Sequence, residues 1–419
     1  FVMGGGSDSA TGMSESDAFA TIQHGVTVLK PGDILTILPG KYHEAVCWEF
    51  DGSADVKTVV RAQYPGTVLL HGDTALPNFA AVSGRANCHQ AELPTPPEAI
   101  LELDTLKTYD NCSSFTEGIG DTNIGSFRYD DSRHLLQINP FDVLAFVHHT
   151  ITVSDIPRCG FKVMPASDNG TVQNIEIDGL CVRGFNSRVM HGNDSIWGIF
   201  ITSPVNCTIR RCTAYLNAGG IGMRHARNSR IEHCQAYANG NLRNVSAGNI
   251  IMQIAADSVI DHCLSFRSAT YGIRFYGNNK NNIISNCLSL GDVRGSIWIK
   301  PPDPNSKLVN SYSPDMVAVG KSETSVFRSD DYDPDLKKSP TSLQLGKNNN
   351  VMAYPRDFAD PWNFDLRLQE KSQFKCGFAG SAVFFLSPEG DDSNSGRSIV
   401  SPWKTLTKVP DGATVYLLP

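Results

Sequence analysis

Cationic and aromatic side chains recur along residues 198–300 at intervals of twenty-odd residues. Each lies within or directly after a short apolar segment that opens on Gly, Asn or Ser, so these side chains take one of two equivalent places in successive segments. The cations are Arg224, Arg274 and Lys300, and neighbouring places hold Gln253, Tyr276 and Trp298. Guanidinium and ammonium groups bind carboxylate or sulfate, while aromatic rings stack on sugar rings. Aligned in space, these side chains would suit an anionic sugar polymer.

The chemistry that such a surface could perform is β-elimination from a uronate. A cation neutralises the carboxylate and so acidifies the proton at C5, which Arg, Lys, His or Tyr then removes. Arg224, Arg274 and Lys300 are therefore candidate catalytic residues, with His225 and Tyr276 as further candidates for the base. Tyr276, Trp298 and Gln253 are candidate substrate-binding residues. The competing interpretation is that Arg, Lys and Tyr only keep an exposed sheet soluble.

A second possible chemistry is glycoside hydrolysis, which needs two or three carboxylates close together. Glu232 and Asp261 take the same place in successive segments, immediately before His233 and His262. Strict strand alternation would turn the carboxylates inward and the histidines outward, unless this edge lies at a turn. At a turn, the carboxylates could bind Ca²⁺ or simply be solvated.

The elements that must position these side chains are short strands. An Ile, two variable residues and a Cys recur in four successive segments, ending at Cys212, Cys234, Cys263 and Cys287, in steps of 22, 29 and 24 residues. Apolar residues alternate with a period of two, which indicates strands rather than helices. Repeats of this length, separated by turns rich in Gly and Asn, are typical of a solenoid. The sequence therefore predicts an all-β fold, a right-handed parallel β-helix.

Eleven cysteines in a secreted chain would usually suggest disulfides. Here four of them fall on one inward position of successive coils, where Cys acts as a small apolar residue. We therefore expect an internal column of mostly reduced thiols. No Cys or His spacing matches a zinc site, so the sequence assigns no metal ligands, and Ca²⁺ is the one possible cofactor. His148 and His149 lie outside the repeat and are interpreted as a surface pair.

The domain organisation follows from where the repeat holds and where it breaks. We expect an N-terminal helical cap and the first coils in residues 1–73, and a β-rich insertion with a return to the solenoid in residues 74–170. Residues 171–320 are the regular ladder, and residues 321–381 are the last coils and loops. Residues 382–419 match residues 1–40 in order, which predicts the start of a second β-helix module.

Charge and hydropathy narrow the range of partners. The 419-residue chain carries a net charge of −7, which argues against a nucleic-acid partner because such proteins normally present a basic face. No apolar run approaches the roughly 18 residues of a membrane span.

Two segments resemble the opening signature of bacterial secreted right-handed parallel β-helix proteins, the pectate-lyase-like superfamily. They are SPEGDD…G…SPWKTL…DGATVYLLP near the C-terminus and a looser N-terminal copy that ends in PGDILTILPGKY. The hairpin sequence FRYDDSRHLLQI also resembles insertions in such proteins. This superfamily contains polysaccharide lyases, several glycoside hydrolases, alginate epimerases and uncharacterised surface proteins. The resemblance implies fold and export, because its motifs are structural and none is a catalytic signature.

We therefore expect an exported protein, secreted or at the bacterial cell surface, that acts on a polysaccharide, with β-elimination ahead of hydrolysis. The alternative is a non-enzymatic surface, matrix or fibre protein that self-associates through its solenoid ends or tandem modules. The enzyme and the structural protein should differ in how their titratable side chains cluster. An enzyme should gather titratable groups in one groove bounded by the insertion, whereas a structural rod should show no such groove.

Overall fold

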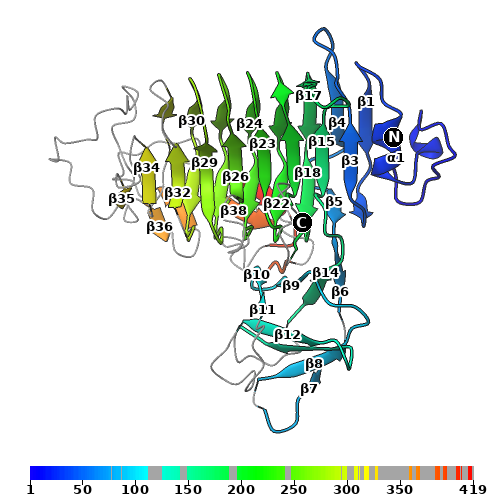
Figure 1. Ribbon diagram of the computed structural model, residues 1–419, viewed down its shortest axis with the longest axis vertical. Helices are drawn as coiled ribbons and strands as arrows, with labels where there is room; N and C mark the ends of the chain where they lie inside the picture. The colour runs from blue at the N-terminus through cyan, green and yellow to red at the C-terminus, as the bar shows by residue number, and fades with distance from the viewer. Residues whose placement is uncertain are drawn as a thin grey trace.

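Three long and mostly parallel sheets wind around one axis to form a solenoid (Figure 1). The computed structural model describes residues 1–293 except 77, 86, 112–124, 142–148, 188–195 and 241–246, together with residues 295–299 and short segments between 306 and 417. Neighbouring strands of each sheet come from successive coils. The fold is a right-handed parallel β-helix, as the sequence predicts. Among the described residues, the helices are too short or too polar to span a membrane.

We name the sheets A, B and C in the order in which a coil visits them; within the described residues they hold eight, seven and nine strands. Sheet A contains β1 (Ile34–Ile37), β4 (Thr58–Ala62), β17 (Ile175–Asp178), β21 (Thr208–Arg210), β24 (Arg230–Glu232), β27 (Val259–Asp261), β30 (Ile283–Ser285) and β33 (Lys307–Val309). Sheet B contains β2 (Gly40–Tyr42), β5 (Val68–His71), β18 (Leu180–Arg183), β22 (Thr213–Tyr215), β25 (Gln235–Tyr237), β28 (Leu264–Phe266) and β31 (Leu288–Leu290). Sheet C contains β3 (Val46–Glu49), β15 (Phe161–Met164), β19 (Ile199–Thr202), β23 (Ile221–Arg224), β26 (Gly248–Gln253), β29 (Tyr271–Tyr276), β32 (Gly295–Ile299), β34 (Met316–Val319) and the antiparallel β35 (Val326–Arg328). A short pair, β16 (Val172–Gln173) and β20 (Pro204–Val205), bridges two coils.

Like residues stack on like residues inside the solenoid. In sheet A, Ile231 pairs in register with Ile209 on one side and Ile260 on the other. The four cysteines of the repeat are each at most 1% exposed, which confirms the predicted column: Cys212, Cys234, Cys263 and Cys287. The cysteines of the described residues are free thiols. Burial raises the pKa of the Cys234 thiol well above its usual value, so it stays protonated and unreactive.

In the four coils that carry the repeated cysteine, one left-handed residue separates the sheet A strand from that cysteine. His233 has a φ of 53° and His262 a φ of 48°, and their rings stack with centroids 4.9 Å apart. Because the chain turns here, Ile231 and Cys234 both point inward while Glu232 is partly exposed. The inward orientation that strict alternation predicts for the carboxylates is therefore wrong, and this edge lies at a turn.

Between β5 and β15 the chain leaves the solenoid and forms two further sheets. One contains β10 (Lys107–Thr108), β9 (Ala99–Glu102), β14 (Ile151–Ser154) and β6 (Asp73–Ala75). The other contains β11 (Asp110–Asn111), β12 (Ser126–Asp130), β13 (Leu135–Asn139), β8 (His89–Glu92) and β7 (Ala80–Ala81). The hairpin expected around residues 127–138 is present as the antiparallel pair β12 and β13. This insertion has its own apolar core and projects from one side of the solenoid (Figure 1).

Side-chain contacts attach the insertion firmly to the solenoid. The Arg183 Nε donates to Asp73 Oδ1 at 3.1 Å, and the Ser187 hydroxyl donates to Glu98 Oε2 at 2.7 Å. The Ser154 hydroxyl donates to the carbonyl of Gly184. These contacts all lie where the coil leaves sheet B, so the insertion is fixed against that turn.

The two ends of the chain share one arrangement of hydrogen bonds. Near the N-terminus, Asp8 accepts from the amide of Ala20 and from the amide and hydroxyl of Thr21. Near the C-terminus, Asp392 accepts in the same way from Lys404 and Thr405. The nearby elements are η1 (Glu15–Asp17) and α1 (Ile22–Thr27) at the first end, and β36 (Phe358–Asp360), β37 (Asp365–Leu368), β38 (Val383–Leu386) and β39 (Thr414–Leu417) toward the second. The bridges of Val2 to Phe19 and Ile37 also have a counterpart, because Leu386 pairs with Trp403 and Leu417.

Candidate functional site

Two outward rows of side chains run along sheet C parallel to the solenoid axis. The inner row consists of Phe200, Gly222, Ile251, Arg274 and Trp298, which pair in register from β19 to β32. The edge row consists of Thr202, Arg224, Gln253 and Tyr276. The alignment predicted from the sequence is therefore present. Lys300, the remaining predicted catalytic residue, lies outside the described residues.

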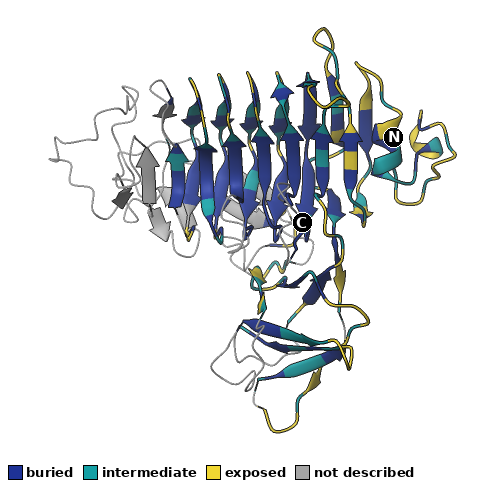
Figure 2. Cartoon of the chain, viewed as in Figure 1, coloured by how far each residue is buried: buried dark blue, intermediate teal, exposed yellow. Residues whose placement is uncertain are grey.

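The inner row is buried except for the half-buried Trp298, and Figure 2 shows how far burial extends along these strands. The ring of Trp197 stacks on that of Phe200 with centroids 5.1 Å apart. It also lies over Gly222, where an added Cβ would come within 2.9 Å of the indole ring. Ile251 is fully buried in the same apolar cluster. Most of the inner row therefore packs as an apolar layer on the outside of the sheet.

Arg274 is only 1% exposed and lies among three aromatic rings. Its guanidinium carbon is 4.0 Å from the ring centroid of Tyr271, 4.6 Å from that of Tyr276 and 5.6 Å from that of Trp298. Such cation–π contacts stabilise a desolvated cation. The expectation that Arg274 lines an open face is wrong, because the rings enclose the charge. Its contact with Tyr276 and Trp298 instead holds both predicted binding residues in place.

The edge row remains partly exposed and continues into a set of basic residues. His225 follows Arg224 with a φ of 57°, and its amide donates to the carbonyl of Gln253 at 2.8 Å. Arg227 and Lys280 are exposed on the next bridge between coils. We call Arg224, His225, Arg227 and Lys280 the basic edge.

Burial and neighbouring positive charges favour the neutral form of His225. Partial burial of its ring lowers the pKa of His225, and the positive charges of Arg224 and Arg227 lower it further. A neutral imidazole can accept a proton at neutral pH, whereas the flanking guanidinium groups stay charged. The basic edge therefore combines a proton acceptor with three cations, Arg224, Arg227 and Lys280.

The carboxylates considered for hydrolysis belong to an ion-pair network. Glu232 is 2.9 Å from Arg230, and Asp261 is 2.9 Å from His262 and 3.8 Å from Arg230. Burial would raise the pKa of Asp261, but hydrogen bonds from Ser285, His262 and Asn286 outweigh it and lower the pKa. A hydrolase needs one carboxyl group with a raised pKa as its acid, so this pair fits a structural network better. Across the residues that the structure describes, no group of three or more His, Cys, Asp and Glu could hold a metal ion.

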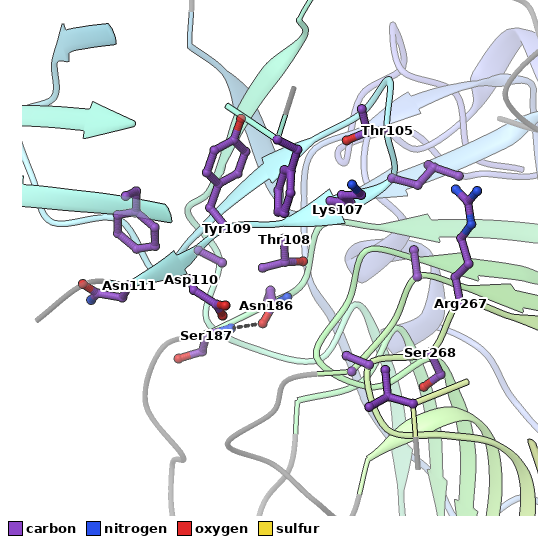
Figure 3. A pocket seen from close by; sticks show the side chains of 18 of the residues that line it. Thr105, Lys107, Thr108, Tyr109, Asp110, Asn111, Asn186, Ser187, Arg267 and Ser268 are labelled. Atoms are coloured by element: carbon purple, nitrogen blue, oxygen red, sulfur yellow. Dashed lines mark hydrogen bonds between the residues drawn. The ribbon is translucent and has the colours of Figure 1, made fainter. Parts of the chain in front are cut away.

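A cleft of about 790 Å³ separates the insertion from the solenoid (Figure 3). One wall is residues 98–111 of the insertion, and the other is formed by the turns that follow sheet B. Those turns contribute one left-handed residue per coil, including Ala238, Arg267 and Gly291. The charged residues of this junction cleft are Glu98, Asp104, Lys107, Asp110 and Arg267.

Sequence reasoning expected a groove bounded by the insertion if the chain is an enzyme, but it named none of the residues of the junction cleft, because the two walls are far apart in the chain and share no period. The available signal was the irregular segment 184–187, which interrupts the repeat directly after a sheet B strand. Behind the insertion wall, Tyr109 donates to Glu102, and His149 Nδ1 lies 3.2 Å from the same carboxylate. The His149 side chain is 2% exposed, so its interpretation as a surface residue is wrong. His148 lies outside the described residues.

Comparisons with known proteins agree on the fold. A family model described as "Right handed beta helix region" matches residues 166–300. The structure "The complex structure of XylC with xylose" has a TM-score of 0.51 at 13% sequence identity, and the match covers 74% of this chain and 65% of that one. This chain thus spans less than two thirds of that protein's length.

Two further structures are similar over longer shares of their own chains. One is described as "Glycoside hydrolase", with a TM-score of 0.46 and 8% identity over 74% of this chain and 92% of that one. The other is "Crystal structure of pectate lyase Pel9A", with a TM-score of 0.41 and 12% identity over 89% of each chain. No curated protein matches the sequence. The match to the first structure, at 13% identity, concerns the fold alone and does not extend to activity.

Proposed function

We propose that this is an exported carbohydrate-active β-helix protein that cleaves an anionic polysaccharide by β-elimination at the basic edge. One observation carries the proposal. Arg224, Gln253 and Tyr276 align across successive coils, with His225 and Arg227 beside them. A polymer lying along the solenoid axis would meet these side chains in turn.

The roles follow from charge and position. Arg224 and Arg227 bind the uronate carboxylate and stabilise the negative charge that develops on it. Neutral His225 takes the proton from C5, the electrons of that bond form the double bond between C4 and C5, and the bond from C4 to the leaving oxygen breaks. The leaving oxygen takes a proton from solvent. Gln253 and Tyr276 bind neighbouring sugar units by hydrogen bonding and ring stacking.

The insertion supports an enzyme over a structural rod. Titratable groups gather in the junction cleft, which the insertion bounds, and a rod built only from repeated coils would have no such groove. The ion pairing of Glu232 and Asp261 favours elimination over hydrolysis at the ladder.

The test is incubation with a panel of uronate and sulfated polysaccharides. Unsaturated products are followed by ultraviolet absorbance and hydrolysis products as reducing ends without that absorbance. We expect unsaturated products, lost by about 10²-fold or more in Arg224→Met and in His225→Gln. The matched control is Lys41→Met, which removes an exposed lysine from β2 and should leave turnover unchanged. Reducing ends alone would indicate a hydrolase, and the absence of either product would favour the structural alternative.

A further inference from the structure

We propose that the junction cleft is a second saccharide-binding site, which takes the end of an acidic oligosaccharide independently of cleavage at the basic edge. The cleft lies at the turns after sheet B, whereas the basic edge lies at the opposite end of the sheet C strands. Its volume of about 790 Å³ is within the range of small-molecule sites, roughly 300–1,000 Å³. The proposal rests on the following features of its walls.

The first feature is a buried amide with an unused donor. Asn186 is 1% exposed and lines the cleft. Its Oδ1 accepts from the Ser187 amide at 2.9 Å, but its Nδ2 has no hydrogen-bond partner in the described part of the chain. Buried polar groups are nearly always paired, and leaving one unpaired costs about 1–3 kcal/mol. An acceptor oxygen of a ligand in the cleft would satisfy this donor.

The second feature is the separation of charge across the cleft. Figure 3 shows the head groups of Lys107 and Arg267 on one side, and Asp110 with Asn186 on the other. Glu98 and Asp104 are already engaged, the first by Ser187 and the second by Thr150. The exposed Asp110 carboxylate remains available to accept from sugar hydroxyls, while the two cations would bind a sugar carboxylate.

The third feature is an aromatic surface beside the cations. The Lys107 ammonium lies 4.4 Å from the ring centroid of Phe141, which is partly exposed. Tyr109 and Phe127 also line the cleft but are almost fully buried. Phe141 can therefore stack on one face of a sugar while Lys107 reaches a carboxylate on the same ring. A neutral sugar could use the aromatic surface but offers no carboxylate to Lys107.

The cleft is also held open before any ligand binds. Hydrogen bonds join the insertion to the turn that carries Asn186. The Ser187 hydroxyl donates to Glu98, and the backbone N–H of Asn186 donates to the Ser154 hydroxyl at 3.2 Å. A site whose walls are already fixed loses less conformational entropy on binding than a flexible one. This rigidity distinguishes the cleft from an accidental gap between two parts of the chain.

The experiment is isothermal titration calorimetry of the full chain with three acidic probes, the tetrasaccharides of galacturonate, mannuronate and guluronate, and with neutral cellotetraose. We expect at least one acidic probe to bind and cellotetraose to bind much more weakly. Lys107→Met and the isosteric Asn186→Asp should each weaken binding by about tenfold or more. Lys41→Met serves as the matched lysine control and should bind like the unaltered protein. If Asn186→Asp fails to fold, Lys107→Met together with Asp110→Asn, both at exposed positions, decides the question.

The measurement separates this proposal from the proposed function. Arg224→Met should lose the formation of unsaturated products. It should still bind the acidic tetrasaccharide at the junction cleft, which is the binding that Lys107→Met weakens. If no polymer is cleaved but binding depends on Lys107 and Asn186, only the elimination proposal falls. Failure of all three acidic probes to bind, equal binding of cellotetraose, or binding that is unchanged in both cleft variants would overturn the second site.

Discussion

Asn217 and Asn186 are both buried asparagines near the turns after sheet B, but they lie in regions that are built differently. Asn217 belongs to the regular ladder. Its Oδ1 accepts from the Phe185 amide at 3.0 Å, and its Nδ2 donates to the Val182 carbonyl at 3.0 Å and to Asn239 at 3.1 Å. Asn186 lies where the insertion meets the solenoid, and its Nδ2 has no such partner among the described residues.

The difference shows how a solenoid satisfies its polar groups. In the ladder, each coil supplies partners to the next, so Asn217 bonds to Asn239 and Asn239 in turn to Asn249. At the junction, the neighbouring surface is the insertion, which does not repeat the pattern. At the junction, the Nδ2 of the buried Asn186 has no partner among the described residues, and this donor is a group that a ligand can use.

The largest expected effect tests whether a cation of the ladder can be structural. Arg274→Ala should lower the free energy of unfolding by about 2–5 kcal/mol, because it empties a buried space among Tyr271, Tyr276 and Trp298. Urea denaturation followed by circular dichroism measures the change. Arg227→Ala, at an exposed position, is the control and should stay within about 0.5 kcal/mol of the unaltered protein. Equal stability of the two variants would show that the enclosed guanidinium contributes no packing.

The next effect compares the two asparagines directly. Asn217→Ala should cost about 2–3 kcal/mol, because it leaves the Phe185 amide and the Val182 carbonyl without their partner inside the core. Asn186→Ala should cost less than about 1 kcal/mol, because only its bond to the adjacent Ser187 amide is lost. The same denaturation experiment measures both variants. A larger loss for Asn186 than for Asn217 would mean that its amide already has a structural role.

A smaller effect tests the attachment of the insertion. Ser187→Ala removes the hydroxyl that donates to Glu98 and should lower stability by about 1 kcal/mol. Because that bond also fixes one wall of the junction cleft, we expect calorimetric binding of acidic tetrasaccharides to weaken by a few-fold. Thr67→Ala, which removes a hydroxyl bonded only to the nearby carbonyl of Tyr64, should leave binding unchanged. Unaltered binding in Ser187→Ala would indicate that other contacts suffice to hold the wall.

The regular part of the fold was predictable because the same contact recurs in each coil. The Ile and Cys positions recur at one place per coil, so burial of Cys212 through Cys287 followed from their spacing alone. The alignment of Arg224 with Gln253 and Tyr276 followed for the same reason. The place of a repeated side chain can be predicted without knowing any distant contact, because it depends only on which side of the strand the residue faces.

The candidate sites were less predictable, for two physical reasons. Whether an outward residue is exposed depends on what packs over it, and nothing in the spacing of Arg274 reveals that Tyr271 and Trp298 enclose it. The junction cleft requires residues 98–111 to meet Arg267, more than 150 positions later, and no periodic signal links them. The spacing also left open whether Glu232 faces inward or outward, because a single left-handed residue at His233 decides it.

The smallest expected effect concerns the basic edge, where burial and the charges of Arg224 and Arg227 lower the pKa of His225. Arg227→Gln removes one of the two positive charges that lower the pKa of His225. The pKa should therefore rise toward its ordinary value, by less than about one unit because burial and Arg224 remain. Nuclear magnetic resonance titration of the histidine ring measures this shift, and Lys41→Met should leave it unchanged.

The sign of the shift fixes its consequence for activity. Since His225 acts as a base only when neutral, the unaltered protein should keep its elimination rate to a pH below the ordinary histidine value, and the rate should fall as the pH drops through the lowered pKa. In Arg227→Gln this acid limb should move to higher pH, and added salt should shrink the difference between the two proteins because the repulsion is screened. An acid limb that does not move while the ring pKa does would separate His225 from the reaction and assign the proton transfer to another group.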